Sequence, residues 1–181
     1  MQRLTKPSFL VKLRAGALSL VLLPLVVPAV AKAENPTHVR QLLETRQCPN
    51  CDLRGANLMD ANLFKANLAG ANLEGAYLAG ANLFGANLER ANLNRASLYL
   101  AILVNANLAG AQLVGTRLTL SNLVNANLSG ANLENAVMKG ANMIDVNLTA
   151  ANLKGADLDR ANLSGANFSQ TIFDRPPALR K

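Results

Sequence analysis

The sequence predicts an all-β solenoid, in which the chain coils repeatedly around one narrow, four-sided core. Three observations predict it. An apolar residue, usually Leu, recurs every five residues from residue 51 to 175 without one insertion. Departures from this repeat recur every 20 residues. Aromatic residues make up only 4% of the 181 residues and Trp is absent, although a core of ordinary shape would use more of them because each buries so much area.

Each five-residue repeat is centred on one apolar residue. There are 25 centres from position 53 to 173, and 21 of them are Leu. Ala usually stands two residues before the centre, with Asn between. Five residues turn an α-helix by ~500°, which would spread the Leu residues over every face. A bend in every repeat instead keeps Ala and Leu inside and Asn outside, with the next two residues forming a corner. The centres that are not Leu are Met138, Met143, Phe168 and Phe173.

Irregular residues line up at a spacing of 20, which indicates four repeats per coil. The residue before the centre departs from Asn in one column, and the residue after the centre is apolar in another. About six coils at ~4.8 Å each would make a rod roughly 30 Å long. The first column contains Tyr77, Ser97, Arg117, Val137 and Asp157, and the second contains Phe64, Phe84, Val104, Val124 and Ile144.

Residues 1–33 have the pattern of a secretory signal peptide. Five basic residues and no acidic residue lie in this segment, and an apolar stretch runs from Ala15 to Val30. The small residues of Ala-Lys-Ala at 31–33 predict cleavage after Ala33. A retained membrane anchor is the alternative, but two prolines interrupt the stretch and it is shorter than the ~20 residues that span a bilayer. We therefore expect an exported chain that has no membrane segment after cleavage.

Residues 34–50 are expected to form a helical cap and linker. A short helix should run from Pro36 to about Gln47, with Asn35 as N-cap and proline at the first helical position. Its apolar residues Val39, Leu42 and Leu43 would cover the first coil, whose open edge would otherwise pair with other chains.

The repeat region, 51–175, is expected to be closed at its other end by larger side chains. Phe168 and Phe173 replace Leu in the last coil. The tail, 176–181, opens with two prolines, which cannot continue a β-strand ladder.

Cys48 and Cys51 form the one reactive-looking motif. The expected export favours a structural disulfide, which would join the cap helix to the first coil. A redox-active dithiol is a second interpretation, although such cysteines usually begin a helix rather than follow one. Zinc is a third, but it needs two more ligands, and His38, the single histidine, is expected to be exposed and without a partner. We find no nucleophile and base in a catalytic arrangement, so we expect no enzymatic activity, cofactor, metal or small-molecule substrate.

One set of apolar residues is expected to point outward and to mark an interface. The five residues that follow a centre at 20-residue spacing would form a line ~19 Å long, with further apolar residues nearby. Exposed apolar patches of this kind usually bind a partner, here another protein or a second copy. The alternative is that these side chains lie along the rod and merely cover its backbone. This interaction stripe comprises Phe64, Phe84, Val104, Val124, Ile144, Tyr77, Tyr99, Leu100, Ile102 and Leu120.

The repeat over residues 51–175 resembles the pentapeptide repeat family, whose pattern is A(D/N)LXX. That resemblance implies a right-handed quadrilateral β-helix. The segment from Asn35 to Leu53 is similar to the leader of exported cyanobacterial members, some of which reside in the thylakoid lumen, so the expected location is the periplasm or a thylakoid lumen. Some members mimic DNA and bind topoisomerases, which requires an acidic surface and a cytoplasmic location. Here residues 34–181 carry 13 basic and 11 acidic residues, which also gives no basic stripe for nucleic acid.

The sequence therefore predicts an exported, non-enzymatic structural module that binds a protein partner or itself through one side of a rigid rod. A DNA-mimicking protein and a lumenal thiol–disulfide protein are the alternatives.

Overall fold

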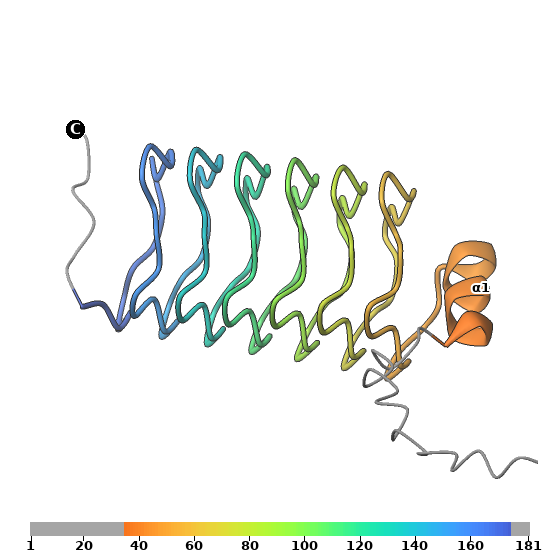
Figure 1. Cartoon of the computed structure of the whole chain (residues 1–181). Helices are drawn as coiled ribbons and strands as arrows, with labels where there is room; N and C mark the ends of the chain where they lie inside the picture. Colours follow the sequence, from red (N-terminus) through yellow and green to blue (C-terminus); the bar gives the residue numbers. More distant parts are fainter. Residues whose placement is uncertain (1–34, 175–181) are drawn as a thin grey trace, which may run out of the picture. The chain divides into compact units, whose positions relative to one another are not determined.

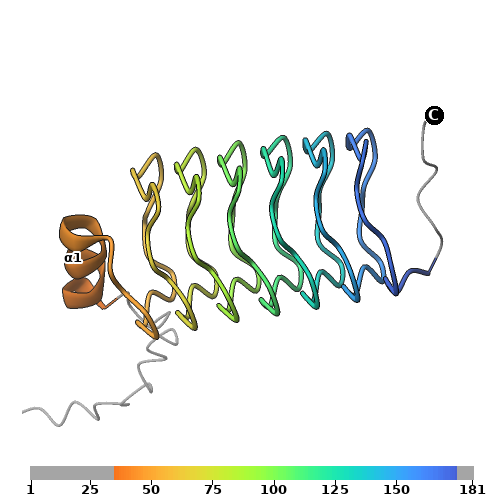
Figure 2. The same cartoon turned by 180° about the vertical axis from the view of Figure 1, so that it is seen from behind.

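A computed structural model describes residues 35–174 of the chain. The expected signal peptide at 1–33 and the tail at 176–181 lie outside the described residues. The described part contains one helix, α1 (Pro36–Thr45), followed by a stack of similar coils (Figure 1). Seen from behind, the coils keep the same spacing and direction to the end of the described part (Figure 2).

The coil contains four repeats, as the 20-residue spacing predicts. Every parallel β-bridge joins residues 20 apart, from Gln47 with Asn67 to Asn152 with Ile172. The 126 residues from 47 to 172 therefore make about six coils. Each repeat supplies one bridged residue between two turns, so the described residues form a β-helix without any longer strand.

We number the four faces of the coil by their outward-pointing bridged residues. Face 1 contains Asp52 and every twentieth residue after it, face 2 starts at Asn57, face 3 at Asn62 and face 4 at Gln47. A corner is named by the two faces that it joins. Corner 2/3, for example, consists of residues 59 and 60 and their equivalents 20 residues apart.

The core is a column of Leu and Ala, as the repeat predicts. The centres from Leu53 to Leu148 are at most 1% exposed, and burying each Leu is worth roughly 1.5–3 kcal/mol. The backbone closes around them. The Leu103 N–H donates to Asn122 O of the next coil at 2.7 Å, and the Ala106 N–H donates to Leu103 O at 3.0 Å across the corner.

The second residue of each corner adopts a left-handed backbone conformation. Its φ lies between 53° and 71° at every such position from residue 50 to residue 170. Glycine adopts this conformation without strain, which explains its frequency at this position. Other residue types there carry a conformational cost.

Asparagine side chains form ladders along two faces. On face 4, Asn147 Nδ2 donates to Asn127 Oδ1 at 3.2 Å, and Asn127 Nδ2 donates to Asn107 Oδ1 at 3.2 Å. Each Asn Oδ1 also accepts a backbone N–H two residues later, such as that of Ser129 at 3.1 Å. Face 1 has the same pattern, with Asn152 donating to Asn132 at 3.1 Å. Among the described residues, face 3 has no such ladder.

Helix α1 begins where the sequence predicts and ends earlier. Asn35 Oδ1 accepts the N–H groups of Thr37 and His38 at 3.1 and 3.3 Å. The helix ends at Thr45 rather than near Gln47, because Arg46 has φ 56° and its N–H donates to Leu42 O at 2.8 Å. The first bridge is at Gln47, so residues 47–50, which we assigned to the cap and linker, belong to the first coil.

The cap covers the first coil through fewer apolar residues than expected. Leu42 is fully buried and Val39 packs against the core. The expectation for Leu43 was wrong, since its side chain is 50% exposed. At the other end, the rings of Phe168 and Phe173 lie 5.5 Å apart at 50°, and both remain partly buried.

His38 has a partner, contrary to expectation. It is half-buried, and its Nδ1 accepts the N–H of Asp52 at 3.0 Å. This hydrogen bond ties α1 to the backbone of the first coil.

The narrow core leads to a prediction at Leu103, which is fully buried in the middle of the stack. Leu103→Ala should lower the free energy of unfolding by about 2–5 kcal/mol, because a cavity cannot close in a rigid coil. Leu103→Met should cost less than about 1.5 kcal/mol, since Met138 and Met143 already occupy equivalent positions. Thermal or denaturant unfolding followed by circular dichroism measures both. Equal stability of the alanine variant and the parent would contradict an inward Leu103.

The contact between α1 and the coil leads to a second prediction. His38→Ala should cost about 1 kcal/mol, because it leaves the Asp52 N–H without its acceptor. His38→Asn keeps an acceptor near the position of Nδ1 and should recover part of the loss. Hydrogen exchange of the Asp52 amide checks this directly. An amide that stays equally protected in the alanine variant would show that the hydrogen bond does not hold the cap.

Candidate interaction surface

Nine of the ten residues of the expected interaction stripe fall on one side of the β-helix, which we call the apolar side: face 3 and its two flanking corners. Tyr99, Leu100 and Leu120 lie at corner 2/3, Ile102 lies on face 3, and Tyr77 lies on the adjoining face 2. The remaining five follow one another along corner 3/4: Phe64, Phe84, Val104, Val124 and Ile144.

The exposure of these residues divides the stripe. Tyr77, Tyr99, Leu100, Ile102 and Leu120 are between 41% and 56% exposed. Along corner 3/4 only the first residue reaches 37%, and the other four are half-buried. The rings of Phe64 and Phe84 stack at 5.5 Å, so these side chains lie along the rod rather than projecting from it. The most exposed apolar surface is therefore at corner 2/3 and on face 3.

The middle coil is apolar from one corner to the other. Residues 98–104 read Leu-Tyr-Leu-Ala-Ile-Leu-Val. Leu98, Ala101 and Leu103 point into the core and are at most 1% exposed. Tyr99, Leu100 and Ile102 point outward at 43%, 50% and 41% exposure. Apolar surface continuous across a whole face is typical of a protein interface.

The fold does not explain the exposed apolar residues, because several of them weaken it locally. Leu100 and Leu120 hold the left-handed corner conformation, with φ 57° and 58°, which costs about 1 kcal/mol or more for a residue with a Cβ. Ile102 stands where face 3 otherwise has Asn. It therefore lacks the side-chain acceptor that Asn82 offers to the N–H of Phe84 at 3.1 Å.

Six charged residues border the apolar side. Asp60, Lys139, Asp159 and Arg160 lie at corner 2/3, and Lys65 and Asp145 lie at corner 3/4. Lys139 forms a salt bridge with Asp157 at 3.1 Å, and Arg160 forms one with Asp159 at 3.8 Å. Lys65 Nζ lies 5.3 Å from the centre of the Phe64 ring.

Asp157 is held ionised by its surroundings. The backbone N–H of Asp159 donates to Asp157 Oδ1 at 3.1 Å, and this hydrogen bond, followed by the pairing with Lys139, lowers the pKa of Asp157. The negative charge beside Lys139 therefore persists at neutral pH.

Sequence reasoning missed Met59, whose side chain is 54% exposed on the apolar side. It precedes Tyr99 by 40 residues, so it occupies the same corner position two coils earlier. The 20-residue spacing was thus a sufficient signal. The charges of Asp60, Lys65, Lys139 and Asp145 were also missed, because each is unremarkable until the corners are assembled.

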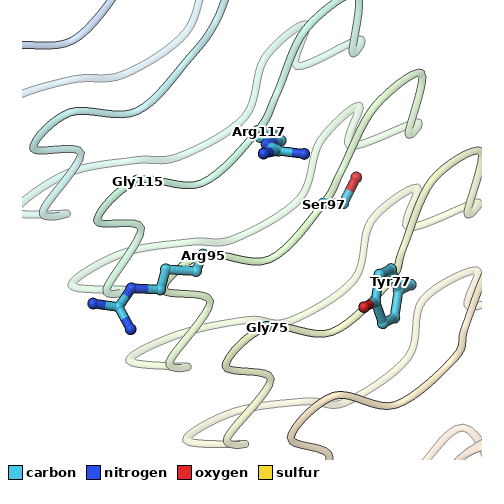
Figure 3. Close-up of a pocket in the computed structure, with 6 residues that line it drawn as sticks. All are labelled: Gly75, Tyr77, Arg95, Ser97, Gly115 and Arg117. Carbon is cyan, nitrogen blue, oxygen red and sulfur yellow. The ribbon is translucent and has the colours of Figure 1, made fainter.

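A shallow groove of about 450 Å³ lies on face 2, beside the apolar side. Figure 3 shows Ser97 between Tyr77 and Arg117 on successive coils, with Arg95 directed away from them. The two guanidinium groups do not converge on one point, so the groove lacks the arrangement of a specific anion site. It is lined by Gly75, Tyr77, Arg95, Ser97, Gly115 and Arg117.

Cys48 and Cys51 form a disulfide, but it does not join the helix to the coil as we expected. Cys48 occupies the centre position of the first repeat on face 4, and Cys51 takes the place of Ala on face 1. The bond therefore crosses one corner of the first coil. Both residues are buried, at 0% and 5% exposure, which keeps the sulfurs away from thiols in solution.

Residues 35–174 offer little for a metal site or for a membrane-spanning helix. No group of three or more His, Cys, Asp or Glu residues lies close enough there to hold a metal ion. Within the same residues, no helix has the length and apolar character needed to cross a membrane.

Comparison with known proteins gives one family. The family model described as pentapeptide repeats matches in 8 copies, over residues 48–80, 61–99, 101–140 and 141–175. No curated protein matches the chain.

Solved structures with similar coils come from several organisms. Rfr23 from the cyanobacterium Cyanothece 51142 is 28% identical over 77% of this chain and 99% of its own, with a TM-score of 0.36. A pentapeptide repeat protein of the Arabidopsis thaliana thylakoid lumen is 32% identical over 60% of this chain and 72% of its own, with a TM-score of 0.35. QnrB1, a plasmid-mediated fluoroquinolone resistance protein, is 21% identical over 70% of this chain and 77% of its own. Its TM-score is also 0.35. At these TM-scores the likenesses support no conclusion about function.

The position of the disulfide leads to a prediction. The Cys48→Ala/Cys51→Ala variant should lose at most about 2 kcal/mol, because the closed loop is short and other corners hold the same backbone without a disulfide. Thermal unfolding of parent and variant measures the difference. Unfolding both in the presence of a reductant is the control: the buried bond is reduced once the chain unfolds, so the parent's midpoint should fall toward that of the variant. Identical midpoints without reductant would show that the bond contributes nothing to stability.

Proposed function

This chain belongs to the pentapeptide repeat family, and from that premise we propose that it is an exported, non-enzymatic structural module that binds protein through its apolar side. The observation that carries the proposal is the exposure of Tyr99, Leu100 and Ile102 across one whole face. The interior is filled by Leu and Ala, which leaves function to the outward residues. We take the coil to be right-handed, as in the family.

The chemistry of this surface suits a protein partner. Its centre is apolar and aromatic, and its border carries charges of both signs. Protein interfaces have this composition, with charge depleted at the centre and polar groups at the rim. A nucleic-acid partner would favour a concentration of Lys and Arg instead.

Export is supported by the N-terminal sequence and by the disulfide. Residues 1–33 have the three parts of a signal peptide, and a disulfide between Cys48 and Cys51 is typical of an oxidising compartment. We propose the periplasm or a thylakoid lumen as the location.

The two alternatives have less support. A DNA mimic would need a strongly acidic surface, whereas residues 34–181 carry 13 basic and 11 acidic residues. A thiol–disulfide protein would need an accessible sulfur, whereas Cys48 and Cys51 are buried.

Photo-crosslinking tests the proposed function. The full chain is expressed in its host with a photoreactive amino acid at Ile102, on the apolar side, or at Gln112 as the control. Gln112 is the equivalent exposed position on face 1, across the coil from face 3. We expect protein adducts, either of another protein or of a second copy, from position 102 and not from 112. No adducts at 102, or the same adducts at both positions, would reject the apolar side as a binding surface.

A further inference from the structure

Four of the six charges that border the apolar side have a self-complementary order, and the other two, Asp159 and Arg160, pair with each other at 3.8 Å. At corner 2/3, Asp60 lies toward the N-terminal end and Lys139 toward the C-terminal end. At corner 3/4 the order is reversed, with Lys65 toward the N-terminal end and Asp145 toward the C-terminal end. Such a surface meets opposite charge when it faces a copy of itself that runs the other way.

We propose that the occupant of the apolar side is a second copy of this chain, packed face to face and antiparallel. The proposal rests on the proposed function and names its partner. A two-fold axis lies across face 3 at the level of Ile102. In a closed dimer of this kind, residue i of one copy meets residue j of the other wherever j meets i.

The 20-residue register fixes which charges meet. Residues 65 and 145 lie two coils on either side of residue 105, so the axis places Lys65 opposite Asp145 of the second copy. In the same way it places Asp60 opposite Gly140, the neighbour of Lys139, and Met59 opposite Lys139 itself. Asp60, Lys65 and Asp145 form no salt bridge within the described residues of one chain. All three are therefore available to a second copy.

The same axis matches apolar residues with apolar residues. Ile102 and Val104 meet their own counterparts, Phe84 meets Val124, and Phe64 meets Ile144. The centre of the contact is thus apolar, and the charges lie at its two ends. This is the usual anatomy of a protein interface.

A parallel pair of rods fits less well. It would bring corner 2/3 of one copy against corner 3/4 of the other, so Asp60 would meet Lys65 and the corner of Lys139 would meet that of Asp145. This arrangement matches the charges as well. However, it would set the apolar line of corner 3/4 against Thr119 and Lys139, whereas the antiparallel pair sets that line against itself.

The size of the surface sets the expected affinity. At ~4.8 Å per coil, residues 64 and 144 lie ~19 Å apart along the rod. A contact of this length belongs to the small class of interfaces. We therefore expect reversible dimerisation with a dissociation constant in roughly the micromolar range.

Analytical ultracentrifugation over a concentration series tests the dimer. The full chain is expressed in its host, and the protein is purified after any processing that the host carries out. Ile102→Asn restores the residue that the repeat has elsewhere on face 3, so it should fold at least as stably as the parent. We expect it to weaken dimerisation at least tenfold. Gln112→Asn likewise restores the Asn of the repeat, but on face 1, and should leave the dimer intact. A parent that is monomeric at all concentrations would overturn the proposal, as would equal dimerisation of the Ile102→Asn variant.

Charge reversal tests the orientation. Lys65→Glu should weaken the dimer, and adding Asp145→Lys in the same chain should restore it, because each reversed residue again meets its opposite. Adding Asp60→Lys instead should weaken it further. Restoration by Asp60→Lys rather than by Asp145→Lys would overturn the antiparallel arrangement.

The two proposals can fail separately. A monomeric parent that still gives adducts to another protein at position 102 would refute the second copy and keep the binding function. A monomeric parent without adducts would refute both.

Discussion

The narrow interior of the coil is the constraint on which the rest of the structure depends. Four inward centres close each turn of the chain, and the backbone bonds between turns join residues 20 apart. Leu fits this space and few other residues do, as the burial of every centre from Leu53 to Leu148 indicates. Because the inside admits almost no variation, the sequence can vary only at the outward positions and at the corners.

This constraint turns the surface into a regular lattice. Each outward residue has a fixed neighbour 20 residues away, so a run of similar residues becomes a line along the rod. The Asn lines on faces 1 and 4 strengthen the fold through hydrogen bonds between side chains. Within the described residues, the apolar side has no such ladder. Its exposed residues cost local stability instead, which is why we propose a binding role for them.

Most of the fold could be predicted from the sequence because its determinants are local and repeated. The register, the four repeats per coil and the N-cap at Asn35 each follow from patterns of a few residues. The contacts of the cap could not be predicted in the same way. The bond between His38 and Asp52, the exposure of Leu43 and the position of the disulfide depend on how a helix of period 3.6 meets a coil of period 20. The candidate surface shows the same division: its residues lie at the expected positions, but the stacking of Phe64 on Phe84 depends on side-chain conformations that the repeat does not specify.

The rigidity of the coil also bears on how its apolar side can bind. Leu100 and Leu120 are fixed in the left-handed conformation by backbone bonds on both sides of their corners, such as that from the Leu120 N–H to Lys139 O at 2.9 Å. Their conformational cost is therefore met when the chain folds, not when it binds. A surface that is already ordered loses little entropy on association, which raises affinity for a given contact area. Burial of α1 residue Leu42 over the first coil closes the N-terminal end of the stack, so only the sides of that part of the rod remain open. A stiff rod with one closed end and one apolar side is thus suited to lateral binding rather than to growth from that end.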